Sequence, residues 1–168
     1  FDLTPLFVGA QGTLGVITEV TLETMPYNPA KDFIVAGFID RESAWTAVQR
    51  LNEMKDSASA IDFVDKTLLK TVELLNPAIL KPLEGGMPAV LLFIDIDNEA
   101  SRVRKKIAKK IRKTLESCGA EVVEPSESDE AVWERLRDAA SLHLTHVSGK
   151  KRAIPVLDDA QVPLDKMI

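Results

Sequence analysis

The sequence predicts an α+β fold in which helices pack on an antiparallel sheet. Two strand–helix–strand units follow one another, at residues 33–64 and 89–123. Each unit combines short apolar strands with a longer amphipathic helix, and two such units side by side favour a ferredoxin-like sandwich. A β-rich, glycine-containing segment at residues 6–25 precedes them.

The first unit begins with an apolar strand at residues 33–39. Asp40 is placed to cap a helix over residues 42–54, whose buried side carries Ala44, Val48 and Leu51. Residues 60–64 form a short second strand. Asp65 then caps a helix that carries Leu68, Leu69, Val72 and Leu75, and a loop rich in proline and glycine follows it.

The second unit contains the most apolar strand, residues 89–96, which we expect at the centre of the sheet. A long helix should begin at Asn98 and end at Cys118, with Gly119 as its C′ residue. Its apolar positions recur every four residues, at Val103, Ile107, Ile111 and Leu115. A fourth strand at 121–123 precedes a helix that starts near Asp129 and turns Trp133, Leu136 and Ala140 inward.

The N-terminal segment reads as two strands around a glycine cluster. Residues 16–22 alternate between two faces in the period-2 pattern of a strand with one wetter face. Pro26 and Pro29 stop this strand and make a stiff connector. We therefore expect one domain to end at residue 29 and a second to occupy residues 30–168. Because the chain opens at Phe1 inside structured-looking sequence and stops abruptly at Ile168, we expect a fragment of a larger protein.

Composition restricts the function. The 168 residues carry a net charge of -5, which argues against a general nucleic-acid binder. The single cysteine, Cys118, excludes an internal disulfide framework and fits a reducing compartment, so we expect a cytoplasmic protein. No apolar run approaches the roughly 18–20 residues that cross a bilayer.

Three glycines, Gly9, Gly12 and Gly15, are spaced as GxxGxxG. Closely spaced glycines let a backbone approach a ligand and supply positive-φ positions for a tight turn. The dinucleotide fingerprint would need a helix after the glycines, whereas a strand pattern follows here, and no Gly-Lys-Ser/Thr of a phosphate loop is present. On spacing alone, a glycine-rich hairpin without a ligand is the favoured interpretation.

The residues from Phe7 to Leu22, with Pro26 after them, resemble the end of the FAD-binding domain in vanillyl-alcohol-oxidase-type flavoproteins. The similarity is to the glycolate oxidase and D-lactate dehydrogenase branch, with Gln11 in place of the usual Glu. Further similar segments follow in the family's order, at residues 59–69, 91–97, 133–140 and 158–163.

The resemblance implies an FAD-dependent enzyme that oxidises a 2-hydroxy acid such as D-lactate or glycolate by hydride transfer to the flavin. Electrons would pass on to an acceptor protein or a quinone. The general base would lie outside this chain, and we expect the chain alone to be inactive. The cofactor would lie along a set of backbone and small side-chain positions, namely Gly9, Gly12, Thr13, Gly15, Val16 and Thr18.

An arginine after the tryptophan would bind the substrate carboxylate, because a planar guanidinium can do so through two hydrogen bonds. The family's usual position is occupied by Leu136, so the candidates are its neighbours Arg137 and Arg135, with Arg137 the better fit to the residues that follow. Both are equally compatible with a solvated helix surface.

Three alternatives stay open. His143 and His146 form an HxxH pair, but no further ligand is nearby, so we expect no metal. The basic run from Arg102 to Lys113 reads as the solvated face of a helix, or as a contact for an acidic subunit or for lipid headgroups at the membrane periphery. Finally, a ferredoxin-like fold is also compatible with a non-enzymatic ligand- or partner-binding regulatory module.

Overall fold

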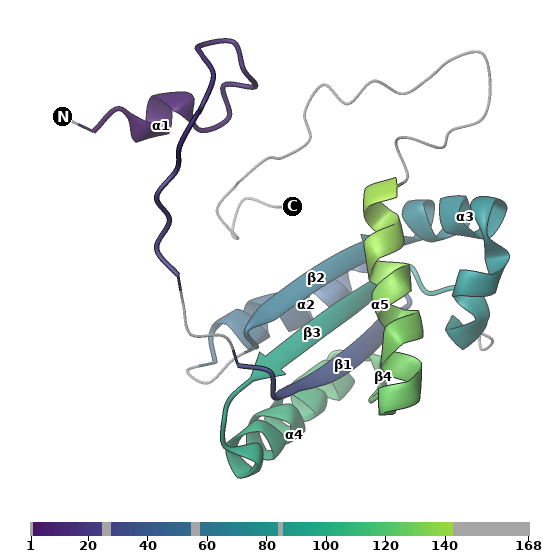
Figure 1. The fold of residues 1–168 in the computed structure, drawn as a ribbon. Coiled ribbons are helices and arrows are strands. Elements are labelled where there is room, and N and C mark those ends of the chain that lie inside the picture. Colours follow the sequence, from purple (N-terminus) through teal and green to yellow (C-terminus); the bar gives the residue numbers. More distant parts are fainter. Residues whose placement is uncertain (1, 25–27, 55–57, 84–85, 143–168) are drawn as a thin grey trace.

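The computed structural model describes residues 2–24, 28–54, 58–83 and 86–142. Its sheet has four antiparallel strands in the order β2-β3-β1-β4 (Figure 1). The strands are β1 (Lys31–Phe38), β2 (Ala60–Asp65), β3 (Val90–Asp97) and β4 (Glu121–Val123). The predicted α+β architecture is confirmed at this level, and β3 lies in the interior of the sheet as expected.

Helices cover both faces of the sheet. In Figure 1, α5 (Glu127–Leu142) crosses in front of the strands, whereas α2 (Arg41–Asn52) and α4 (Ser101–Ser117) lie behind them. The helix α3 (Lys66–Leu75) and the 3₁₀ helix η1 (Pro77–Leu83) pack on the same side as α5. We call the two sides the α2–α4 face and the α3–α5 face.

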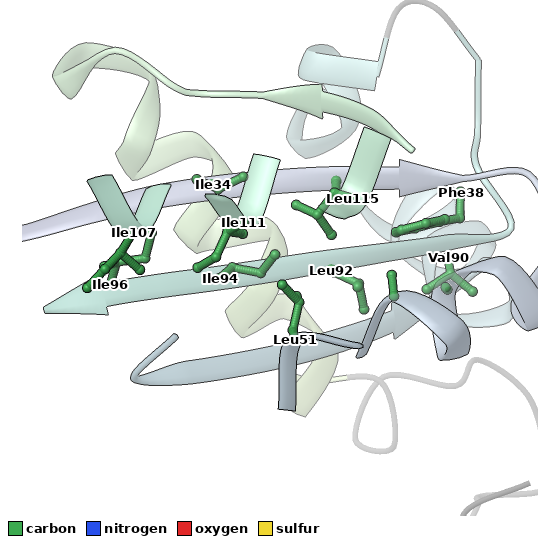
Figure 2. Close-up of a cluster of buried hydrophobic side chains, with 13 residues drawn as sticks. Ile34, Phe38, Leu51, Val90, Leu92, Ile94, Ile96, Ile107, Ile111 and Leu115 are labelled. Carbon is green, nitrogen blue, oxygen red and sulfur yellow. The ribbon is translucent and has the colours of Figure 1, made fainter. Parts of the chain in front are cut away.

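Strand alternation divides the core between these two faces. Even-numbered side chains of β1 and β3 point to the α2–α4 face, where they meet Leu51 of α2 and three residues of the predicted α4 stripe, Ile107, Ile111 and Leu115. The fourth predicted residue, Val103, is 42% exposed. Figure 2 shows this cluster, which also contains Ile34, Phe38, Val90, Leu92, Ile94 and Ile96. Odd-numbered side chains point to the α3–α5 face and pack against Leu69, Val72, Trp133, Leu136 and Ala139.

Local capping explains where the helices begin and end. The Asp40 carboxylate accepts a hydrogen bond from the Ser43 amide, and Asp65 accepts one from the Leu68 amide, at 2.7 and 3.0 Å. Both predicted N-caps are thus confirmed. Gly119 has a φ of +83° directly after α4, as a C′ glycine should.

One detail of the helix predictions needs correction, and another is untested. Asn98 does not start α4, because its Oδ1 accepts from the Ala100 amide and closes a turn that delays the helix to Ser101. On α5, Ala139 is buried. The side chain of Ala140, the residue predicted to be inward, lies outside the described part.

The β-rich tail predicted for residues 6–25 is wrong. Residues Thr4–Phe7 form the short helix α1, and no strand occurs among the described residues from 8 to 24. A strand needs a neighbour for its hydrogen bonds, and the described strands pair only with one another. The apolar side chains of this segment are therefore exposed, Val16 to 90% and Leu22 to 75%. In Figure 1 the segment runs outside the sandwich.

Candidate functional site

The α3–α5 face carries the arginine that the sequence singled out. Arg137 lies one helical turn after Trp133 on α5, so it shares the side of the helix that covers the sheet. Its side chain is 24% exposed and its guanidinium carbon lies 5.9 Å from the centre of the Phe33 ring. Arg135 is exposed and belongs to a different side of α5, so only Arg137 points toward the strands.

Two aspartates of the sheet already bind this arginine. Arg137 Nη1 donates a hydrogen bond to Asp95 Oδ2 of β3 at 3.1 Å, and it lies 3.6 Å from Asp62 Oδ2 of β2. Antiparallel pairing of β2 with β3 brings these carboxylates to one side of the sheet. The other oxygen of Asp95, Oδ1, is buried without a hydrogen-bond donor among the described residues. This cluster can therefore still accept a hydrogen bond.

A second ion pair extends the cluster along the edge of the same face. Lys31, the first residue of β1, donates to Glu134 Oε1 at 2.7 Å and lies 3.3 Å from Glu130 Oε1. The hydrogen bond to Glu134 raises the pKa of Lys31, with partial burial acting against it. The same bond lowers the pKa of Glu134. Both partners are thus held in their charged forms.

Sequence reasoning missed these partners of Arg137 and Lys31. One signal was available, since Asp95 stands in the most apolar strand of the chain, where an acidic residue requires a partner. The alternation of β3 assigns Asp95 to the face of Leu91 and Phe93. The identity of its partner depends on how α5 crosses the sheet, which no local pattern encodes.

The glycine segment forms a solvent-exposed turn. Gly9 and Gly12 have φ values of +79° and +74°, and Gln11 between them has +48°, so the turn uses the left-handed region that the glycine spacing predicted. Thr13 closes it, with its amide donating to the Ala10 carbonyl at 2.9 Å. No described atom outside the adjoining residues lies within 4 Å of a Cβ built at Gly9, Gly12 or Gly15.

This geometry suits one wall of a cofactor site. The unobstructed glycine backbone would let a flat ligand approach, and Val16 and Thr18 continue the same exposed strip. The segment fits FAD only as such a wall, because the described residues supply no second wall around it. The HxxH histidines and residues 158–163 lie outside the described residues.

A hollow lies elsewhere on the α3–α5 face, away from the charged cluster. It has a volume of about 270 Å³ and is lined in part by Val35, Leu83, Met87, Leu91 and Trp133. Glu121 also lines it. Neither candidate arginine lines it.

Comparison with known sequences defines the class of protein. The family described as FAD linked oxidases, C-terminal domain, matches residues 28–168, and the chain belongs to this family. Among similar proteins, the glycolate oxidase subunit GlcD of Bacillus subtilis is 26% identical over 168 residues, which cover 97% of this chain and 33% of that protein.

Two further relatives agree with this assignment. The glycolate oxidase subunit GlcD of Escherichia coli is 28% identical over 160 residues, covering 94% of this chain and 28% of the relative. A D-lactate dehydrogenase of Anaerostipes hadrus is 24% identical over 122 residues, covering 71% of this chain and 26% of the relative. The chain thus spans a third or less of the length of these curated relatives.

Proposed function

We propose that this chain is the substrate-covering part of an FAD-dependent oxidoreductase that oxidises a small 2-hydroxy acid. The observation that carries the proposal is the family match over residues 28–168. The names of the relatives, glycolate oxidase subunit and D-lactate dehydrogenase, support the substrate class. The exposed glycine turn, which lies before the matched region, supports a contact with FAD.

We assign residues 1–29 to the end of the FAD-binding domain and residues 30–168 to the cap domain. The start of the family match at residue 28 supports this boundary. We also assign the cap to the ferredoxin-like class. The strand order β2-β3-β1-β4 and the placement of α2 and α4 on one face favour that class.

The cofactor is assigned to the strip formed by the glycine turn and the residues after it. When bound, FAD supplies the redox chemistry by accepting a hydride from the substrate α-carbon. The protein's part here is to lie against the cofactor through Gly9, Gly12, Thr13, Gly15, Val16 and Thr18.

The substrate carboxylate is assigned to Arg137, with Arg135 as the second candidate. Arg137 is favoured because it is partly buried, faces the sheet and is held in place by Asp95. Its contact with Asp62 is longer than a hydrogen bond, and a substrate carboxylate would compete with that residue first.

Electrons would pass to an acceptor protein or a quinone, and we expect the enzyme in the cytoplasm. No helix within the described ranges is long and apolar enough to cross a membrane.

The full-length protein provides the test. Its visible spectrum should show bound flavin, and D-lactate, glycolate or 2-hydroxyglutarate should bleach it. A flavin that none of the three reduces would contradict the substrate class. A full-length protein that contains no flavin would favour a non-enzymatic ligand-binding module, for which the hollow beside Trp133 is the candidate site.

Two matched variants test the arginine assignment in that protein. Arg137→Lys should raise KM by roughly 10- to 100-fold, because the bidentate, charge-assisted contact with the substrate carboxylate is lost. Arg135→Lys, two residues away on an exposed side of the helix, should leave KM unchanged. The opposite ranking would transfer the substrate contact to Arg135.

A further inference from the structure

The helix α4 carries a dense positive charge that the oxidoreductase assignment does not use. Eight of the 21 Lys and Arg residues lie between positions 102 and 113, and Glu116 is the one acidic residue of α4. The other 13 basic residues share the rest of the chain with 25 of its 26 acidic residues. The helix is therefore strongly positive on a molecule that is otherwise acidic.

The geometry of the helix places this charge outward. Ile107, Ile111 and Leu115 are buried against the sheet. At 100° per residue, the exposed cations spread over an arc of about 160° centred opposite that stripe. We call this surface the cationic face. It consists of Arg102, Lys105, Lys106, Lys109, Lys110, Arg112 and Lys113. Arg104 is excluded, since its guanidinium is 3.2 Å from Asp32 and largely buried.

Few of these charges are neutralised. Arg112 pairs with Glu124, and Lys110 also has an interaction. The others, Arg102, Lys105, Lys106, Lys109 and Lys113, have no acidic group within 4.0 Å among the described residues. Several stand four residues apart, where like charges repel across a helical turn. Arg102 also lies at the positive end of the helix dipole. These features cost helix stability, which favours an external anion as their counterpart.

The chemistry of the face selects the kind of anion. Protein interfaces are anchored by buried aromatic or aliphatic side chains and are depleted in Lys. The cationic face has five lysines and no aromatic residue, and Ile107, Ile111 and Leu115 of α4 are already buried in the core. Flexible lysines without an apolar anchor suit a diffuse layer of negative headgroups.

We propose that the cationic face of α4 binds an anionic phospholipid surface by electrostatic contact, without insertion into the bilayer. This interaction is independent of the assigned chemistry, because no residue of the face belongs to the glycine turn or to the Arg137 cluster. It would hold the molecule at the membrane periphery with α4 against the headgroups.

Sedimentation with vesicles tests the proposal. The chain should bind phosphatidylcholine vesicles that contain phosphatidylglycerol, and should not bind pure phosphatidylcholine vesicles. Binding should fall steeply with added salt, since the contacts are exposed charges. The triple variant Lys106→Gln, Lys109→Gln, Lys113→Gln should lose about 100-fold in affinity, at roughly fivefold for each charge near an anionic surface.

A second triple variant provides a matched control. Lys66→Gln, Lys70→Gln, Lys81→Gln removes the same charge from exposed positions away from α4 and should keep the affinity within about twofold. The α4 variant should melt no lower than the parent chain, because it removes repulsion. Equal losses in both variants, or no binding by the parent at low salt, would overturn the proposal. Equally tight binding to polyglutamate or duplex DNA would also overturn it and assign the face to another polyanion.

Discussion

The two faces of the sheet are closed in different ways, although the same strands β1 and β3 form both. The α2–α4 face is filled by aliphatic side chains and Phe38, and Arg104 with Asp32 forms the ion pair at its edge. The α3–α5 face is built around aromatic rings. Phe33 stacks on Phe93 at 6.1 Å, and Trp133 meets Phe93 edge-on at 6.5 Å.

The α3–α5 face also carries charged side chains. Next to Phe33 and Phe93 on that side of the strands are Lys31 and Asp95. Residues of α5 pair with both, Glu134 with Lys31 and Arg137 with Asp95. The comparison shows that one strand pair can supply stability on one side and a polar, partly buried site on the other. Strand alternation assigns the side chains of β1 and β3 to the two faces, and α5 supplies the partners that complete the polar site.

Adjacent leucines of β3 test this division with the largest expected effect. Leu92→Ala, on the α2–α4 face, should lower the free energy of unfolding by about 3–5 kcal/mol, because an enclosed cavity remains. Leu91→Ala, on the α3–α5 face, should cost about 2–3 kcal/mol, because Leu91 already borders the hollow and its loss enlarges a space open to solvent. Urea denaturation of both variants measures the difference. Equal losses would mean that the two faces are packed equally tightly.

Matched variants of Arg137 and Arg135 test the charged end of the α3–α5 face, and the expected change in the free energy of unfolding is of intermediate size. Arg137→Met should lower the free energy of unfolding by about 1–3 kcal/mol, since the Asp95 carboxylate would lose its donor. Arg135→Met should change it by less than about 0.5 kcal/mol, as expected at an exposed position.

The double variant Arg137→Met, Asp95→Leu separates the ion pair from packing. It should recover much of the loss, because replacing both partners by apolar residues removes the unpaired charge. If the double variant is as unstable as the single one, Arg137 stabilises the fold through its contact with Phe33 and not through Asp95. Thermal melts of the single and double variants give this answer.

Local sequence signals predicted most of the sandwich. Strand alternation and helical spacing located β1 to β4 and α2 to α5, and the side chains of Asp40 and Asp65 marked two helix starts. These features depend on neighbours within a few residues, so a single sequence reveals them. Trp133 and Leu136 mark the side of α5 that packs on the sheet. Arg137, one turn after Trp133, shares that side and Arg135 does not, so the helical spacing favours Arg137.

Pairing across the fold was not predictable in the same way. The alternation at residues 16–22 is as regular as that of a true strand, yet it pairs with no strand in the part of the chain that the structure describes, and a period cannot reveal whether a partner exists. Likewise Asp62, Asp95 and Arg137 are far apart in the sequence and meet only through the β2–β3 register and the path of α5.

The smallest expected effect concerns the edge pair of the α3–α5 face, Lys31 with Glu134. The pKa of Glu134 is lowered, so its contribution is present above the ordinary value of 4.5 and is lost as the pH falls through the folded-state pKa. The pKa of Lys31 is raised, so its contribution is present below the ordinary value of 10.5 and is lost as the pH rises through the folded-state pKa. The pair should therefore stabilise the fold between these limits.

Lys31→Met measures that contribution. Both side chains are more than a third exposed, so solvent screening should hold the loss below about 1 kcal/mol at neutral pH. In acid, well below 4.5, the parent and the variant should melt at similar temperatures, because the protonated Glu134 no longer attracts Lys31. A loss that persists in acid would show that Lys31 acts through packing of its aliphatic stem. In that case the edge of the α3–α5 face would be closed by apolar contact, as the α2–α4 face is.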